Sequence, residues 1–409
     1  MRSVVIVRLY LSTAIVAATA LLLFSSAPTP VGAESSKETL AHWDRPARAI
    51  GAEPAGNSKT GPRPYPKDCA ACHPAKEADW SGSLHSRSTG PGLMAQLAPH
   101  PGEAPGFATA CYRCHAPLIE QSEVIATETG FAINPAFDPV LQSTGVSCAA
   151  CHLRGSVIYG PKKPANIEAD AIGHATAKSA LFSSSEFCAA CHQLDGGYEL
   201  NGTVLTNTYN EWKRSRYATS GITCQKCHMP GKRHLWRGIH DPEMVLSGVD
   251  IATTYDGNAE DGSLSARLTI TNTGVGHMFP TYVTPSATVT AFLKDNRGNI
   301  IERSKQSATI GRSIALDLSE ELFDTRIAPD GKFDFHYTVA EDVDTALAKE
   351  LLFEVTVAPD EFYSRFFASM IENSTPQAGA KKYEMLKEAY KATVASEYLL
   401  YQKVFVLGD

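Results

Sequence analysis

All ten cysteines of this 409-residue sequence lie in one five-residue pattern, Cys-x-x-Cys-His, which occurs five times. Two thiols three positions apart can form thioethers with the two vinyl groups of one haem, and the histidine that follows can bind its iron. The pattern is the attachment signature of c-type haem, so five copies predict five covalently attached haems (haem c). The predicted attachment residues are Cys69, Cys72, Cys111, Cys114, Cys148, Cys151, Cys188, Cys191, Cys224 and Cys227. The predicted iron ligands within the motifs are His73, His115, His152, His192 and His228.

Two other uses of paired cysteines fit the sequence less well. A Cys-x-x-Cys pair can form half of a zinc site or a thioredoxin-like redox centre. Neither use explains why a histidine follows all five pairs, and zinc sites built from two pairs each would suit an even number of pairs. Covalent haem is therefore the preferred interpretation.

Some of the eight histidines outside the motifs are expected on the opposite side of the irons. A neutral imidazole is the usual second axial ligand of an electron-transfer haem. The residues predicted for this role are His85, His174, His234, His240 and His277, with His100 in reserve. A methionine could replace a histidine at one iron, and the candidates are Met94, Met229 and Met278. We expect His42 and His336 to be solvated.

Local context supports three of these ligand predictions. His234 and His240 follow the fifth motif in a segment whose arginines are placed to pair with haem propionates. His277 lies in a glycine-framed turn that leaves a predicted strand, where the backbone can approach a flat cofactor closely. His277 would therefore bring a ligand from the second half of the chain to a haem of the first.

A pentahaem domain is predicted over residues 67–249. The stretches between the motifs do not repeat, so we expect one haem for each short segment of helix and loop. So few residues per haem cannot enclose each macrocycle in a conventional core, and the haem faces must supply much of the buried apolar surface. Trp80 and Trp212 are each followed five positions later by another ring, at His85 and Tyr217. These rings would either flank a haem pocket or fill a small core.

From about residue 250 the pattern changes to short strands. We predict strands over 264–272, 287–294, 299–303, 333–339 and 352–357, which together favour an immunoglobulin-like β-sandwich over 250–360. Residues 361–409 are predicted to be a C-terminal helical segment, with an amphipathic helix over 376–401 that packs back on the chain. The predicted fold class is multidomain α+β, with a haem-packed, mostly helical and loop-rich domain followed by the sandwich and the helix.

The N-terminal residues resemble an export signal rather than part of the fold. Arg2 and Arg8 flank the start of an apolar run that ends near a small-residue cleavage site, so residues 1–33 are predicted to be a signal peptide. The run is short for a membrane span, and we expect no stable span in the mature protein. Residues 34–66 are predicted to form a flexible leader. A periplasmic or cell-surface location follows, and it agrees with haem attachment outside the cytoplasmic membrane.

The charge balance is acidic. The formal net charge of −7 becomes −9 once the signal peptide and its two arginines are removed. An acidic balance argues against nucleic acid as a partner and permits docking to basic patches of other redox proteins, an electron donor and an acceptor.

The sequence resembles multihaem c-type cytochromes related to hydroxylamine oxidoreductase, its tetrahaem partner cytochrome and the pentahaem nitrite reductases. The similar stretches are 145–147 before the third motif, 212–230 ending in Cys-His-Met-Pro, 234–240 and 272–280. The resemblance implies electron transfer through mostly bis-histidine haems. Pentahaem nitrite reductases carry lysine in place of the motif histidine at their catalytic haem, whereas all five motifs here end in histidine. That departure argues against nitrite reduction.

The sequence is compatible with three functions. The favoured one is a pentahaem carrier that relays electrons between periplasmic or cell-surface redox partners. The alternative is a multihaem oxidoreductase that acts on a small nitrogen or sulfur compound at one haem with an open coordination position. In the third, the β-sandwich serves as an assembly or docking module.

Overall fold

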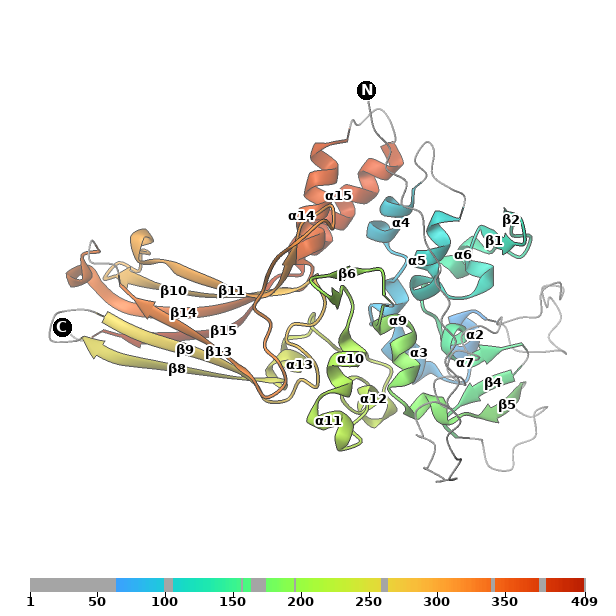
Figure 1. Ribbon diagram of the computed structural model, residues 1–409, viewed down its shortest axis with the longest axis horizontal. Helices are drawn as coiled ribbons and strands as arrows, with labels where there is room; N and C mark the ends of the chain where they lie inside the picture. The colour runs from blue at the N-terminus through green and yellow to red at the C-terminus, as the bar shows by residue number, and fades with distance from the viewer. Residues whose placement is uncertain are drawn as a thin grey trace, which may run out of the picture.

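The computed structural model describes residues 64–98, 106–155, 157–162, 174–194, 196–258, 264–339, 343–374 and 380–407. The predictions for the signal peptide, for His42 and for the reserve ligand His100 fall outside these ranges. Figure 1 shows a helical, loop-rich region on the right and a β-sandwich on the left. Within the described ranges, no helix combines the length and the apolar character needed to cross a membrane.

Short helices and turns make up the cysteine-rich region. Several of these helices begin with a proline at the first helical position, where its fixed φ suits the helix and its missing N–H costs nothing. The helices are α2 (Pro66–Ala70), α3 (Pro74–Ser81), α4 (Pro91–Leu97), α5 (Phe107–His115), α6 (Pro139–Gln142), α7 (Cys148–His152), α9 (Glu186–His192), α10 (Thr208–Lys213), α11 (Arg216–Thr219), α12 (Cys224–His228) and α13 (Pro242–Leu246).

Small sheets connect these helices. The two-stranded pairs are β1 (Val124–Thr127) with β2 (Gly130–Ile133), and β6 (Glu199–Leu200) with β7 (Thr203–Val204). A three-stranded sheet joins β3 (Leu153–Arg154), β4 (Val157–Gly160) and β5 (Ala175–Lys178). Neither the helices nor these sheets enclose a large apolar core, which is consistent with the sequence-based expectation that haem supplies buried surface here.

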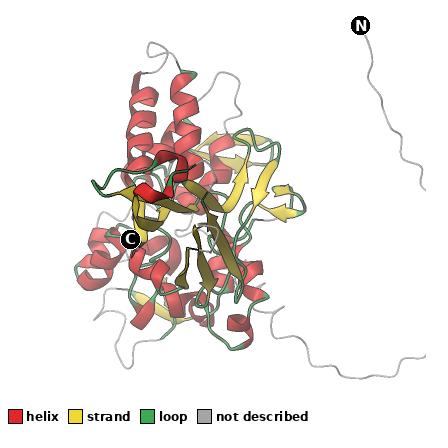
Figure 2. Ribbon diagram, turned by 90° about the vertical axis from the view of Figure 1, so that its left-hand side faces the viewer, coloured by secondary structure: helices red, strands yellow, loops and turns green. Residues whose placement is uncertain are grey.

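Two antiparallel sheets form the β-sandwich. One has the strand order β13 (Lys332–Thr338), β9 (Leu264–Asn272), β8 (Val249–Asn258). The other has the order β12 (Glu321–Asp324), β11 (Gln306–Ile314), β10 (Ser286–Asp295), β14 (Ala348–Ala358), β15 (Tyr398–Val406). In the central pair of the larger sheet, Val289 lies opposite Val355. Figure 2 views the molecule from the sandwich end, with the two long helices at the top.

Alternating side chains fill the space between the two sheets. Along β9 the residues at every second position are buried, and Leu268 is fully buried. On β13, Phe335 and Tyr337 point into the same core, whereas His336 between them is exposed, as its place on the polar face predicted. The core continues through β10 and β14, so the sandwich has a single continuous apolar interior.

Two sequence-based predictions about this half of the chain were wrong. The stretch predicted as a strand at 299–303 forms only an isolated bridge, between Ile300 and Lys294, before the 3₁₀ turn Glu302–Ser304, and the strand begins only at Gln306. The helix predicted to reach residue 401 ends earlier, because α15 spans Ala380–Ala395 and Tyr398–Val406 forms β15. The C-terminal segment is therefore helix and strand, not helix alone.

The helix pair α14 (Glu361–Glu372) and α15 is inserted between β14 and β15. Leu386 and Ala389 of α15 are buried against Ala95 of α4 and Phe367 of α14. The prediction that the C-terminal helix packs back on the chain is thus confirmed, and its contact is with the cysteine-rich region.

Buried arginines of the sandwich hold the two regions together. Arg312 on β11 is 1% exposed and donates to the carbonyls of Leu200, Thr203 and Val204 in the β6–β7 hairpin, at 2.8 to 2.9 Å. The guanidinium of Arg326 pairs with Glu211 of α10 at 3.0 Å, and both side chains are 4% exposed. Because a buried charge needs a partner, these contacts fix the sandwich against the motif-bearing helices.

Candidate haem-binding centre

The five motifs sit at the ends of short helices. Four of them close α5, α7, α9 and α12, each of which ends at its motif histidine. The first motif crosses from α2 to the turn before α3, and His73 immediately precedes α3. One helical turn brings the two thiols of a motif to the same side, and the histidine follows directly.

Backbone carbonyls orient the imidazoles of three motif histidines. The Nδ1 atom of His152 lies 2.6 Å from the carbonyl oxygen of Tyr159, and that of His228 lies 2.6 Å from the carbonyl oxygen of Arg237. For His115 the partner is the carbonyl of Ser88, at 3.0 Å. A carbonyl can only accept, so each Nδ1 carries the proton and each Nε2 keeps a lone pair for a metal.

Three of the predicted second ligands face a motif histidine. The ring centroids are 6.2 Å apart for His85 and His192, and 6.2 Å apart for His152 and His234. For His228 and His277 the separation is 6.3 Å, and the planes differ by 10°. The structure therefore brings together histidines that are 107, 82 and 49 residues apart in the sequence.

The separation within each pair suits an iron between the two rings. A ring nitrogen binds a transition metal at about 2 Å and lies about 1.1 Å from its own centroid, so two imidazoles in line on one metal have centroids about 6.3 Å apart. The Nδ1 atoms of His234 and His277 also approach carbonyl oxygens, those of Lys232 and Met278, at 3.2 and 2.9 Å. Their Nε2 atoms are thus available, and the three pairs fit bis-histidine haem.

Burial keeps these rings neutral. Loss of solvent lowers the pKa of His85 to about 3 and the pKa values of His192, His234 and His277 to about 4. A neutral imidazole is the form that binds a metal, so the donor set is in the required state at neutral pH. Within the described residues, no group of three or more His, Cys, Asp or Glu could hold a metal ion by itself. The histidine pairs suit an iron whose remaining ligands come from a porphyrin.

The backbone of His85 is clamped by the segment that leads into the third motif. Val146 N–H donates to the carbonyl of His85 at 3.0 Å, and the indole of Trp80 donates to the carbonyl of Val146 at 2.8 Å. Gly145 has φ of +58°, and a Cβ there would lie 2.6 Å from the same His85 carbonyl. Only glycine fits at this position, so residues 145–146 fix the position of His85.

A buried carboxylate positions His234. Asp79, 7% exposed, accepts from the backbone N–H of His234 at 2.9 Å and from Nε of Arg233 at 2.8 and 2.9 Å. The Arg233 guanidinium lowers the pKa of Asp79 to about 2, so the carboxylate stays charged and the contact persists. Sequence analysis missed Asp79. The available signal was the neighbouring Trp80, which lies five residues before the predicted ligand His85.

An asparagine shapes the loop that carries His277. Asn272, 1% exposed, donates from Nδ2 to the carbonyl of His277 at 3.0 Å and accepts at Oδ1 from the N–H of Val275 at 3.0 Å. At Gly274 a Cβ would lie 2.6 Å from the carbonyl of Ser247, so the loop packs directly on the segment before β8. The predicted close approach of a glycine-framed turn is therefore present, and the sandwich contributes His277 to the motif-bearing region.

Contacts between cysteines show which motifs are neighbours. Cys69 contacts Cys148, which joins the first motif to the third. Cys114 contacts Cys191, and Cys188 contacts Cys224, so the fourth motif adjoins the second and the fifth. Cys151 of the third motif interacts electrostatically with both cysteines of the fourth.

The histidines give the same neighbour relations. The ring of His152 lies near that of His73, and the ring of His192 lies near those of His115 and His228. The five motifs thus form one connected, branched array in which the first, third and fourth are consecutive and the second and fifth both adjoin the fourth. The amino-acid sequence alone does not indicate which motifs are neighbours in space.

The remaining predicted ligands are placed elsewhere. The Nε2 atom of His240 lies 2.9 Å from a carboxylate oxygen of Asp360, the residue before α14. His174 is half-buried just before β5, with Nδ1 3.4 Å from the carbonyl of Ala175. Among the described residues, His73 and His115 have no second histidine ring at the spacing of the three pairs.

The methionines offered as substitutes are partly buried. Met278 donates its backbone N–H to Glu211 Oε2 at 3.2 Å, and Met229 follows α12 directly. Met94 lies on α4, the helix that packs against α15.

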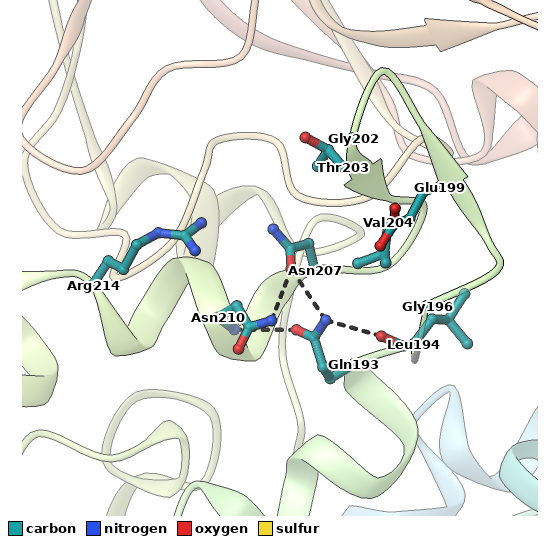
Figure 3. A pocket seen from close by; sticks show the side chains of 10 residues that line it. All are labelled: Gln193, Leu194, Gly196, Glu199, Gly202, Thr203, Val204, Asn207, Asn210 and Arg214. Carbon is teal, nitrogen blue, oxygen red and sulfur yellow. Dashed lines mark hydrogen bonds between the residues drawn. The ribbon is translucent and has the colours of Figure 1, made fainter. Parts of the chain in front are cut away.

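A polar cavity of about 410 Å³ adjoins the fourth motif (Figure 3). Gln193, which follows His192, donates from Nε2 to Asn207 Oδ1 at 3.1 Å, and the backbone N–H of Asn210 donates to Gln193 Oε1 at 3.1 Å. The side chain of Arg214 extends alongside these amides. The cavity can therefore offer hydrogen bonds and a positive charge to a small polar or anionic group.

Comparisons with known proteins agree with this centre. The family described as "Cytochrome c554 and c-prime" matches residues 68–153, which include the first three motifs. A penta-heme cytochrome c552 from Thermochromatium tepidum has a similar fold, with a TM-score of 0.56 and 18% sequence identity. The match covers 83% of this chain and 97% of that one.

Two further comparisons give no information about the function of the protein. A solved structure described as the structural genomics target SoR45 matches with a TM-score of 0.14 and 15% identity, over 27% of this chain and 68% of that chain. No curated protein matches the sequence.

Proposed function

We propose that this protein is an exported pentahaem c-type cytochrome that transfers electrons between periplasmic or cell-surface redox partners. The observation that carries the proposal is the connected array of five motifs together with three histidine pairs whose ring centroids are 6.2 to 6.3 Å apart. Neighbouring attachment sites allow electrons to pass from one haem to the next. The similarity to multihaem cytochromes supports the same function.

Specific residues would hold the haems. The ten motif cysteines form the thioethers, and the five motif histidines bind on one side of each iron. His234 serves the third site, His85 the fourth and His277 the fifth, because these are the rings that face His152, His192 and His228. Bound haem supplies the reversible one-electron chemistry, and the protein excludes water and fixes the rings.

Haem content and coordination test the proposal together. The mature protein, produced in a host that attaches c-type haem, should carry five haems by mass and by pyridine haemochrome absorbance. His277→Ala should leave five haems attached but convert one low-spin ferric EPR signal to high spin. His336→Ala removes an exposed histidine of the sandwich and should change nothing. Fewer than five haems, or an unchanged EPR spectrum in His277→Ala, would contradict the assignment.

One observation favours a second candidate function. Within the described residues, His73 and His115 face no second histidine, so the first and second sites are candidates for an open coordination position. An open iron could bind a small nitrogen or sulfur compound and reduce or oxidise it. Nitric oxide titration of the reduced protein, or cyanide titration of the oxidised protein, would detect such a site. Binding to one haem with turnover supports the oxidoreductase, and the absence of any binding supports the pure carrier.

The sandwich is proposed to be immunoglobulin-like. In chain order its strands give A-B-E in the smaller sheet (β8, β9, β13) and G-F-C-C′-C″ in the larger (β15, β14, β10, β11, β12), which is the variable-type arrangement without strand D. Export is proposed from residues 1–33, and fractionation of cells that produce the full chain tests it. The proposal requires the haem-stained protein outside the cytoplasm, shortened by the predicted signal peptide.

A further inference from the structure

His192 differs from the three motif histidines that face backbone carbonyls. Its Nδ1 atom is hydrogen-bonded to the phenol oxygen of Tyr282, a residue of the β9–β10 connection in the sandwich. The two ring planes differ by 12°, with centroids 6.2 Å apart, so the phenol oxygen lies close to the plane of the imidazole. Sequence analysis did not identify Tyr282, because only the fold brings it to a residue 90 positions earlier.

A chain of hydroxyl groups continues behind Tyr282. The side chain of Thr208, the first residue of α10, interacts with the Tyr282 hydroxyl. The Oγ1 atom of Thr208 lies 2.6 Å from that of Thr281, and Thr281 Oγ1 donates to Glu211 Oε2 at 3.2 Å. Three hydrogen bonds, together with the contact between Tyr282 and Thr208, therefore lead from the imidazole of the fourth motif to a carboxylate.

The carboxylate at the end of the chain is buried and paired. Glu211 is 6% exposed, and its second oxygen accepts from Arg326 at 3.0 Å. Arg326 in turn donates to both oxygens of Asp324, at 2.9 and 2.7 Å. Because the carboxylate only accepts, a single set of donors satisfies the chain: His192 donates to Tyr282, Tyr282 to Thr208, Thr208 to Thr281 and Thr281 to Glu211.

We propose that Tyr282 is a positioning residue that tunes the fourth haem, because it connects the proximal imidazole to the negative charge of Glu211. Hydrogen bonds in such a chain polarise one another, so the phenol oxygen becomes a stronger acceptor than an isolated phenol. A stronger acceptor at Nδ1 makes the imidazole a more electron-rich ligand, which favours ferric over ferrous iron. The chain lowers the reduction potential at the fourth motif. This inference rests on the proposed haem at that motif.

Tyr282→Phe tests the inference, because it removes the hydroxyl and keeps the ring. In a potentiometric titration of the pentahaem protein followed by EPR, one of the five potentials should rise. We expect about a tenfold change in its oxidation equilibrium, or about 59 mV for one electron. Tyr398→Phe is the matched control, because the Tyr398 hydroxyl donates to the carbonyl of Ile239 at 2.7 Å, away from any motif histidine. It should leave all five potentials unchanged.

A second variant breaks the chain without touching Tyr282. Thr208→Val removes the hydroxyl behind the phenol, and the same potential should rise by a smaller amount. If Tyr282→Phe loses haem, Thr208→Val decides the question. Five attached haems with unchanged potentials in Thr208→Val, or a potential that falls in either variant, would overturn the inference. A parent protein with no haem at the fourth motif would instead contradict the proposed function, and haem counting separates the two failures.

Discussion

The two regions of the molecule bury apolar side chains to very different extents. Among the described residues, the sandwich encloses one core of 24 buried residues, whereas the clusters around the motifs contain five and three. The motif cysteines are at most partly buried, although the chain around them is folded. Burial of apolar surface is the main favourable term in folding, so a region with such small clusters requires another source of it. Five porphyrins between the motif helices would supply that surface, whereas the sandwich supplies its own.

The absence of haem should have the largest effect on the difference between the two regions. In protein produced without haem attachment, we expect the amide protons of α5, α7, α9 and α12 to exchange with solvent nearly as fast as in an unfolded chain. The amides of β10 and β14 should stay protected, because their core contains no haem contact. Hydrogen exchange measured by mass spectrometry checks both, with the haem-loaded protein as control. Equal protection of the two regions would contradict the contrast.

The next largest effect on stability is expected from the buried ion pair of Arg326 and Glu211, which connects the two regions. Arg326→Met leaves the buried Glu211 carboxylate without its cation, and breaking such a pair costs about 3–5 kcal/mol. Chemical denaturation followed by haem absorbance should show a lower midpoint. Arg297→Met, at an exposed turn after β10, should change the free energy of unfolding by less than about 0.5 kcal/mol and leave the midpoint almost unchanged. Equal midpoints in the two variants would show that the ion pair does not join the regions.

A cavity in the sandwich should affect that region alone. Leu268→Ala truncates a fully buried side chain, which costs about 2–5 kcal/mol with a typical value near the middle of that range. In a thermal denaturation, near-ultraviolet circular dichroism should show that the sandwich unfolds at a lower temperature than in the parent protein. The haem absorbance should stay unchanged up to the temperature at which the sandwich unfolds. Leu347→Ala, at a site that is 62% exposed, serves as the control. Simultaneous loss of both signals would mean that the regions unfold as one unit.

The smallest effect is expected at the exposed ion pair between the regions. Arg216 of α11 binds Asp330 at 2.8 Å, but both side chains are more than half exposed. Water and salt screen such a pair, so Arg216→Ala should leave the denaturation midpoint within measurement error. A clear loss of stability would show that the contact of Arg216 with the carbonyl of Thr273, at 2.9 Å, holds the His277 loop in place.

The sequence was sufficient where chemistry is local. The cysteine and histidine spacing within a motif requires only one helical turn, so all five motifs could be assigned from their residues. His85, His234 and His277 were among the predicted second ligands, the latter two from local context, and each faces a motif histidine. His240 had an equally suitable context, but Asp360, 120 residues later, lies against its ring. A local pattern cannot contain such a partner.

Long-range arrangements account for what could not be predicted. Tyr282 and Asp79 act through contacts with residues 90 and 155 positions away, and the branched order of the motifs depends on the same kind of contact. The strand at Tyr398–Val406 was missed because the helical pattern before it was extended too far. Its aromatic and β-branched residues were the signal that a strand follows.

The strand that completes the larger sheet follows every other described element in the chain. β15 pairs with β14, but the helices α14 and α15 lie between them in sequence. A chain that emerges with its N-terminus first exposes all ten cysteines while the edge of β14 is still unpaired. His277 belongs to that unfinished sandwich. The order of emergence therefore makes the fifth site the last to gain both of its rings, after covalent attachment at the cysteines has become possible.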